Sequence, residues 1–140
     1  MVPAEEGTPA SGPNEARPCV LYVEDNRANA LLVERALASH ARVALEVVPN
    51  AEDAIRWLTE RTPTLMLLDL HLPGISGEEL LIRLRRQPVY ANLPVVIITA
   101  DAAPSTADRL MAAGATMHLT KPLDIRLLVD VVKRYTERAA

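Results

Sequence analysis

Carboxylates, a hydroxyl group and an amine stand directly after apolar segments at four places in this chain. They belong to the pair Glu24 and Asp25, then to Asp69, Thr99 and Lys121. A carboxylate can act as a nucleophile or a metal ligand, but aspartate is also common in turns, where it hydrogen-bonds its own backbone. What these groups can do together depends on whether the fold brings them to one place.

The apolar segments predict five strands that alternate with five helices. The segment ending at Asp69 is a run of apolar residues, which is typical of a central parallel strand covered on both faces. Residues 43–48 alternate more strongly, as an edge strand with one wetter face does. The predicted strands span residues 19–23, 43–48, 65–69, 95–99 and 117–120.

Polar residues with capping chemistry mark the starts of the predicted helices. The predicted N-caps include Asn26, Asn50, Ser76 and Asp124. Asp53 and Glu79 follow two of these caps at the spacing of a capping box. A fourth helix is predicted over residues 104–113 and ends at Gly114. The arginine-rich run 83–86 is interpreted as a solvated helix face.

This alternation predicts an α/β fold in which right-handed crossovers build a doubly wound parallel sheet with helices on both faces. Parallel strands point the same way, so their carboxyl ends meet at one edge, where ligands bind in open α/β sheets. We therefore expect the polar groups that follow the strands to converge at that edge.

Three carboxylates crowded at one edge repel one another unless a cation lies between them. Oxygen ligands without a histidine or cysteine cluster favour Mg²⁺ or Mn²⁺ over Zn²⁺. Lys121 adds a positive charge and Thr99 a hydroxyl donor, so the edge could hold a tetrahedral dianion beside a carboxylate nucleophile. The chemistry that matches this set best is phosphoryl transfer onto Asp69.

Composition restricts the class of protein. The chain has 140 residues, of which 49% are apolar, and this suits one domain with a single core. Aromatic residues make up 3% and the net charge is -3, which argues against nucleic acid or an anionic membrane as a direct partner. We find no signal peptide or membrane-spanning segment and expect a cytoplasmic protein.

Residues 1–18 are rich in Pro, Gly, Ser, Ala and Glu, with almost nothing to bury. This composition predicts a poorly ordered linker or tail. We expect the folded domain to span residues 19–138.

The ordered set of motifs resembles the receiver domain of a two-component response regulator. The matching motifs are Glu24-Asp25, Asp69, Thr99 and Lys121-Pro122, each after its own predicted strand. The resemblance implies a flavodoxin-like (CheY-like) fold with strand order 2-1-3-4-5. It also implies a domain that takes a phosphoryl group from a phosphohistidine donor onto an aspartate, with Mg²⁺ bound.

Carried over to this chain, the resemblance makes Asp69 the phosphoacceptor. Asp69 and Asp25 would ligate Mg²⁺ directly, together with the backbone carbonyl of His71. Glu24 would act directly or through a water molecule. Such a domain is a switch rather than an enzyme, since it catalyses only its own phosphotransfer and autodephosphorylation.

The resemblance also implies the parts of a switch. Lys121 would pair with the phosphoryl group, and the peptide bond between Lys121 and Pro122 would be cis, as is typical of the family. Thr99 would hydrogen-bond the phosphoryl group and move inward on activation. Where the family usually carries Tyr or Phe, this chain has His118. Its imidazole could follow Thr99 inward and make the switch sensitive to pH, or it could only fill the surface beside the last helix.

Two further positions resemble the family's tuners of phosphoryl lifetime: His71 and Asp101, each two residues after a site residue. The implied partners are a sensor histidine kinase or a histidine phosphotransfer protein. The surface of the fourth helix, fifth strand and fifth helix would then bind a partner or a second copy. The Glu-Asp-Asn signature and the Pro-rich leader favour a hybrid histidine kinase as the origin over a stand-alone regulator.

Two other classes of protein use similar parts. An aspartate-nucleophile phosphohydrolase is expected to carry a second Asp two residues after the nucleophile, where this chain has His71. A flavodoxin-like electron carrier needs a phosphate-cradling loop and aromatic residues beside a flavin, whereas this chain has Glu24-Asp25-Asn26 and few aromatic residues. The phosphohydrolase remains the main alternative.

Overall fold

The computed structural model describes residues 17–137, in which five parallel strands form one sheet. The strands are β2 (Cys19–Val23), β3 (Ala44–Val48), β4 (Leu65–Asp69), β5 (Val95–Thr99) and β6 (Met117–Thr120). The helices are α2 (Arg27–His40), α3 (Ala51–Leu58), α4 (Gly77–Arg85), α5 (Pro104–Ala112) and α6 (Ile125–Glu137), with a 3₁₀ turn η1 (Pro88–Tyr90).

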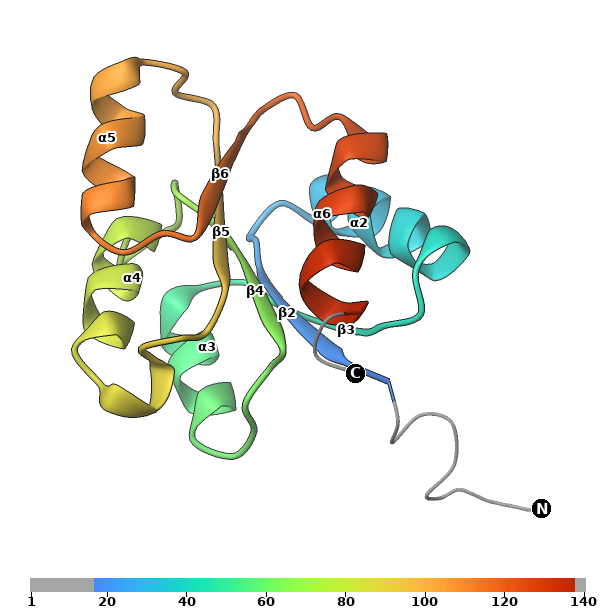
Figure 1. Ribbon diagram of the computed structural model, residues 1–140, viewed down its shortest axis with the longest axis horizontal. Helices are drawn as coiled ribbons and strands as arrows, with labels where there is room; N and C mark the ends of the chain where they lie inside the picture. The colour runs from blue at the N-terminus through green and yellow to red at the C-terminus, as the bar shows by residue number, and fades with distance from the viewer. Residues whose placement is uncertain (1–16, 138–140) are drawn as a thin grey trace.

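The strand order across the sheet is β3-β2-β4-β5-β6, which confirms the predicted doubly wound order. Helices α3, α4 and α5 cover one face and α2 and α6 cover the other (Figure 1). Both clusters of core side chains are dominated by aliphatic residues, as the scarcity of aromatic residues requires. Strands β4 and β5 are buried at every position, because helices cover them on both sides.

The predicted caps form hydrogen bonds that begin the helices. The cap side chains accept from backbone N–H groups three residues on: Asn26 from Asn29 at 2.9 Å, Asn50 from Asp53 at 2.7 Å, Ser76 from Glu79 at 3.1 Å and Asp124 from Leu127 at 3.1 Å. The side chains of Asp53 and Glu79 pair instead with Arg56 and Arg83, so only half of each predicted capping box is present.

The interpretation of residues 83–86 as a solvated face was wrong for Arg85. Its guanidinium donates to the Gly114 carbonyl at 2.9 Å and to the Tyr90 carbonyl at 2.7 Å. Partial burial lowers the pKa of Arg85. Gly114, with φ +111°, leaves room for this side chain, since a Cβ there would lie 2.7 Å from Arg85 Cγ. Arg85 therefore joins α4 to the turn before β6.

The predicted tail lies outside the described residues except for Arg17 and Pro18. The domain limits at residues 19 and 138 stay predictions. Within residues 17–137, no helix has both the length and the apolar composition to cross a bilayer.

Candidate functional site

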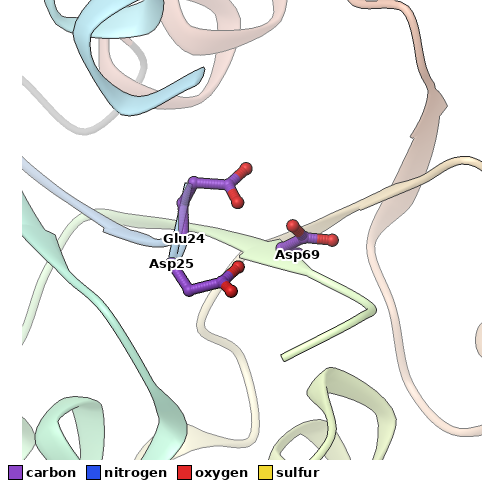
Figure 2. A group of neighbouring side chains, drawn as sticks. All are labelled: Glu24, Asp25 and Asp69. Carbon is purple, nitrogen blue, oxygen red and sulfur yellow. The ribbon is translucent and has the colours of Figure 1, made fainter. Parts of the chain in front are cut away.

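Three carboxylates from two neighbouring strands meet at the carboxyl edge of the sheet. Glu24 and Asp25 follow β2, and Asp69 is the last residue of β4. Val23 pairs with Leu68 in the parallel register, so the residues after them emerge side by side. Each acid offers an oxygen within 4.8 Å of the others. Figure 2 shows the Glu24 and Asp25 side chains extending toward the end of β4, where Asp69 lies.

Glu24 is 3% exposed, and its carboxylate is held from two sides. Its Oε1 accepts from the Tyr22 hydroxyl at 2.9 Å, and its Oε2 accepts from the Asn26 backbone N–H at 3.2 Å. Burial and the nearby Asp69 carboxyl raise the pKa of Glu24 above its usual value. Asp25, in contrast, is exposed and lines a surface cavity of about 440 Å³.

Asp69 is 2% exposed and connects the other two acids to Lys121, which follows β6. Its Oδ1 accepts from the His71 backbone N–H at 3.1 Å, and its Oδ2 accepts from Lys121 Nζ at 3.0 Å. Lys121 Nζ also lies 3.7 Å from Glu24 Oε1. The Lys121 backbone N–H donates to the Thr99 carbonyl at 2.8 Å, and the Lys121–Pro122 peptide is cis, as the resemblance implies.

Gly77 allows α4 to begin directly against the end of β4. A Cβ at Gly77 would lie 2.2 Å from the Asp69 carbonyl oxygen, far inside van der Waals contact. The Gly77 backbone N–H donates to the Leu70 carbonyl at 3.0 Å. Sequence reasoning missed this residue, although a glycine at the first helical position after the Ser76 cap was a visible signal.

Thr99 is completely buried, and its hydroxyl faces the loop after β5. Thr99 Oγ1 accepts from the Asp101 backbone N–H at 2.9 Å. The Asp101 carboxylate in turn accepts from the Ala103 N–H at 2.9 Å and from the Thr106 hydroxyl at 2.6 Å. The Thr106 hydroxyl and the Ala103 N–H lower the pKa of Asp101. Thr106, which no sequence motif indicated, thus links the switch candidate Thr99 to α5.

The two histidines considered for the site, His71 and His118, differ in solvent exposure. His71 is exposed, and its charge contributes a little to the lowered pKa of Asp101. His118 is half-buried on the edge strand β6. Its neighbours Met117 and Leu119 pack with the core beneath α2 and α6, so strand alternation directs His118 to the other face, which Thr99 shares. Its role as a switch stays a prediction.

The donor set fits a hard divalent cation. Glu24, Asp25 and Asp69 supply only carboxylate oxygens, two of the three are buried, and burial together with the nearby Asp69 carboxyl raises the pKa of Glu24. A cation such as Mg²⁺ would relieve this repulsion, and these ligands suit it.

The comparisons with known proteins agree on one family. The family model of the response regulator receiver domain matches residues 20–133. Phosphate regulon transcriptional regulatory protein PhoB of Rhizobium meliloti is 36% identical over 122 residues, which are 87% of this chain and 53% of that protein. The chain thus spans about half the length of this relative.

Two solved structures share the fold. The signal receiver domain of a signal transduction histidine kinase from Syntrophus aciditrophicus has a TM-score of 0.79 and 29% identity, covering 86% of this chain and 91% of that one. The receiver domain of the sensor histidine kinase PA1611 from Pseudomonas aeruginosa PAO1 has a TM-score of 0.76 and 25% identity, covering 85% of this chain and 97% of that one. In that structure a magnesium ion is coordinated in the active-site cleft.

The chain belongs to the response regulator receiver domain family. It is therefore a switch domain of two-component signalling. This membership favours the receiver interpretation over the phosphohydrolase and the electron carrier.

Proposed function

We propose that this domain takes a phosphoryl group from a phosphohistidine donor onto Asp69, in a reaction that requires Mg²⁺. The observation that carries the proposal is the position of Asp69, whose Oδ2 contacts Lys121 Nζ at 3.0 Å while oxygens of Glu24 and Asp25 lie within 4.8 Å. The Asp69 carboxylate thus lies close both to the ammonium group of Lys121 and to an acid pair that could hold a metal ion.

Asp69 is the nucleophile of the proposed reaction. One of its carboxylate oxygens bonds to phosphorus while the bond between phosphorus and the donor imidazole nitrogen breaks, and the imidazole leaves with that electron pair. Lys121 is placed to neutralise charge on the transferred group, which is the main task of a protein in phosphoryl transfer. The Asp69 pairing with Lys121 and the His71 N–H orients the carboxylate before the donor arrives.

Glu24, Asp25, Asp69 and the backbone carbonyl of His71 would hold the Mg²⁺. The metal supplies charge neutralisation for the incoming phosphoryl oxygens. The magnesium ion in the PA1611 receiver domain supports this part of the proposal, because that domain shares the fold at 25% identity.

The output follows from the hydrogen bonds of Thr99. Phosphorylation gives the Thr99 hydroxyl a new acceptor, so the side chain turns inward to donate to the phosphoryl group, and in this exchange its Oγ1 gives up the hydrogen bond that it accepts from the Asp101 N–H. Asp101 is bonded to Thr106 on α5, so this exchange alters the surface of α5, β6 and α6. Met111 on α5 and Leu127 on α6 are each 46% exposed and would supply apolar area for a partner or a second copy.

The implied setting is the cytoplasm, with a sensor histidine kinase or a histidine phosphotransfer protein as donor. The receiver domain of the Syntrophus aciditrophicus histidine kinase supports an origin in a hybrid kinase. His71 and Asp101, both exposed and each two residues after a site residue, are the candidates for setting the phosphoryl lifetime.

Beryllofluoride, a mimic of the phosphoryl group, tests the proposal. With Mg²⁺ it should raise the melting temperature of the wild type and leave Asp69→Ala and Asp69→Asn unchanged. Asp69→Asn should stay folded because it relieves carboxylate crowding, and Asp124→Asn, at the α6 cap, should respond like the wild type. An Asp69→Asn protein that still responds would overturn the assignment.

A further inference from the structure

Tyr22 is a large buried side chain directly beneath the acid pair. It is completely buried in the middle of β2, paired with Val47 and Leu67 on the neighbouring strands. Its ring packs in the apolar core under α2 and α6. A phenol in such a place carries a hydroxyl that must find a hydrogen-bond partner, whereas a leucine would fill the core without one.

The hydroxyl finds this partner in Glu24. Residues two apart on a strand point to the same face, so β2 places the phenol and the carboxylate together. The distance from Tyr22 Oη to Glu24 Oε1 is 2.9 Å, and the bond is buried. The other side-chain groups near this oxygen, Asn29 Nδ2 at 3.5 Å and Lys121 Nζ at 3.7 Å, are farther away.

We propose that Tyr22 is a positioning residue for the cation site, whose hydroxyl fixes the Glu24 carboxylate beside Asp25 and Asp69. The inference rests on the Mg²⁺ requirement in the proposed function. Hydrogen bonds from outer groups to metal-site residues commonly fix their orientation and change metal affinity.

The same bond keeps Lys121 available to Asp69. Glu24 Oε1, once released from Tyr22, would take Lys121 Nζ as its nearest remaining charged donor. Lys121 would then be shared between Glu24 and Asp69, whose Oδ2 it now contacts at 3.0 Å. Tyr22 therefore supports both the cation site and the phosphoryl-facing lysine.

Tyr22→Phe tests this role because it keeps the ring and removes only the hydroxyl. We expect Mg²⁺ affinity to fall about tenfold, measured by calorimetry and, for Mn²⁺, by electron paramagnetic resonance. Tyr90→Phe is the matched control: Tyr90 is also buried, but its hydroxyl donates to the Leu58 carbonyl at 3.0 Å, beneath a different face of the sheet. It should lose stability and keep its Mg²⁺ affinity.

A double-mutant cycle separates positioning from core filling. In a Glu24→Gln background, Tyr22→Phe should change Mg²⁺ affinity less than twofold, since the carboxylate that it positions is gone. A tenfold effect in both backgrounds, or no effect in the wild type, would overturn the role. Wild-type protein with no Mg²⁺ affinity would instead refute the proposed function itself.

A measurement on the unmodified protein covers the case in which Tyr22→Phe does not fold. The buried hydroxyl proton of Tyr22 should give a protected magnetic resonance signal that shifts saturably as Mg²⁺ is added. The Tyr90 hydroxyl signal should not move. A Tyr22 signal that is indifferent to saturating Mg²⁺ contradicts the proposal.

Discussion

The two halves of the sheet edge are built differently. The acid half, at the ends of β2 and β4, consists of Glu24, Asp25 and Asp69. Glu24 and Asp69 are buried, and each accepts a hydrogen bond from a backbone N–H group. The switch half, at the ends of β5 and β6, consists of Thr99 and Lys121; Thr99 accepts a hydrogen bond from the exposed residue Asp101. The acid half is fixed by the central strands, whereas the switch half depends on loop contacts.

This difference assigns binding and response to separate parts of one site. A buried, hydrogen-bonded carboxylate set is preorganised for a cation and an incoming phosphoryl group. Loop hydrogen bonds that water can replace are exchanged at low free-energy cost, so a new ligand can redirect them. Substitutions in the two halves should therefore produce different kinds of defect.

The largest effect is expected from Gly77→Ala, which disturbs the acid half. Its new Cβ would meet the Asp69 carbonyl at 2.2 Å, so α4 or the end of β4 must move. We expect the free energy of unfolding to fall by about 3 kcal/mol in urea titrations, with loss of Mg²⁺ affinity. Gly74→Ala is the control: with φ +72° and only the flexible Glu52 side chain nearby, it should cost about 1 kcal/mol. Equal losses would contradict the close approach at Gly77.

Lys121→Met should separate the halves. It removes the cation 3.0 Å from Asp69 and leaves the three carboxylates in place. Phosphoryl uptake from acetyl phosphate should slow about 10- to 100-fold, because a charge-assisted contact is lost. Mg²⁺ should still bind in calorimetry. Lys133→Met on α6 should react at the wild-type rate, and a Lys121→Met protein that also does so would show that Lys121 has no part in the transfer.

The pH dependence of stability should report on Glu24 in metal-free protein. Its pKa is raised in the folded state above the usual 4.5, so the folded chain binds a proton more tightly than the unfolded chain. The associated stabilisation is complete below the unfolded pKa and is lost as pH rises through the raised folded pKa. Urea titrations across this range should show the decline. Saturating Mg²⁺ or Glu24→Gln should abolish it, and a decline that persists in Glu24→Gln must come from another group.

Thr106→Val should give the smallest of these effects, confined to the switch half. It removes the hydroxyl that donates to Asp101 at 2.6 Å and keeps the side-chain volume. We expect a loss of about 1 kcal/mol, faster amide exchange at Ala103 and unchanged Mg²⁺ affinity. Thr136→Val deletes a comparable buried hydroxyl, bonded to the Val132 carbonyl, and should leave the Ala103 amide unaffected. Altered Mg²⁺ affinity in Thr106→Val would mean that the halves are not separable.

The sequence predicted most of the fold and the positions of the five polar groups, because both follow from local patterns. Apolar runs define strands, and parallel strands bring Asp69 and Lys121 to one edge, although they are far apart in the chain. The contacts of Gly77 and Arg85 were missed because they depend on how closely packed elements approach. The contact of Tyr22 with Glu24 follows from strand alternation, a local pattern that the sequence reasoning did not apply to this pair. A capping pattern shows where α4 begins, but it carries no information on the distance from Gly77 to the Asp69 carbonyl.

The most direct test of the account is to locate the phosphoryl group. Wild-type protein is treated with acetyl phosphate and Mg²⁺, reduced with borohydride, which converts an aspartyl phosphate to homoserine, and mapped by mass spectrometry. We expect homoserine at position 69 only when Mg²⁺ is present. Homoserine at another aspartate would contradict Asp69 as the phosphoacceptor. Equal conversion of Asp69 in excess chelator would contradict a cation site formed by Glu24, Asp25 and Asp69.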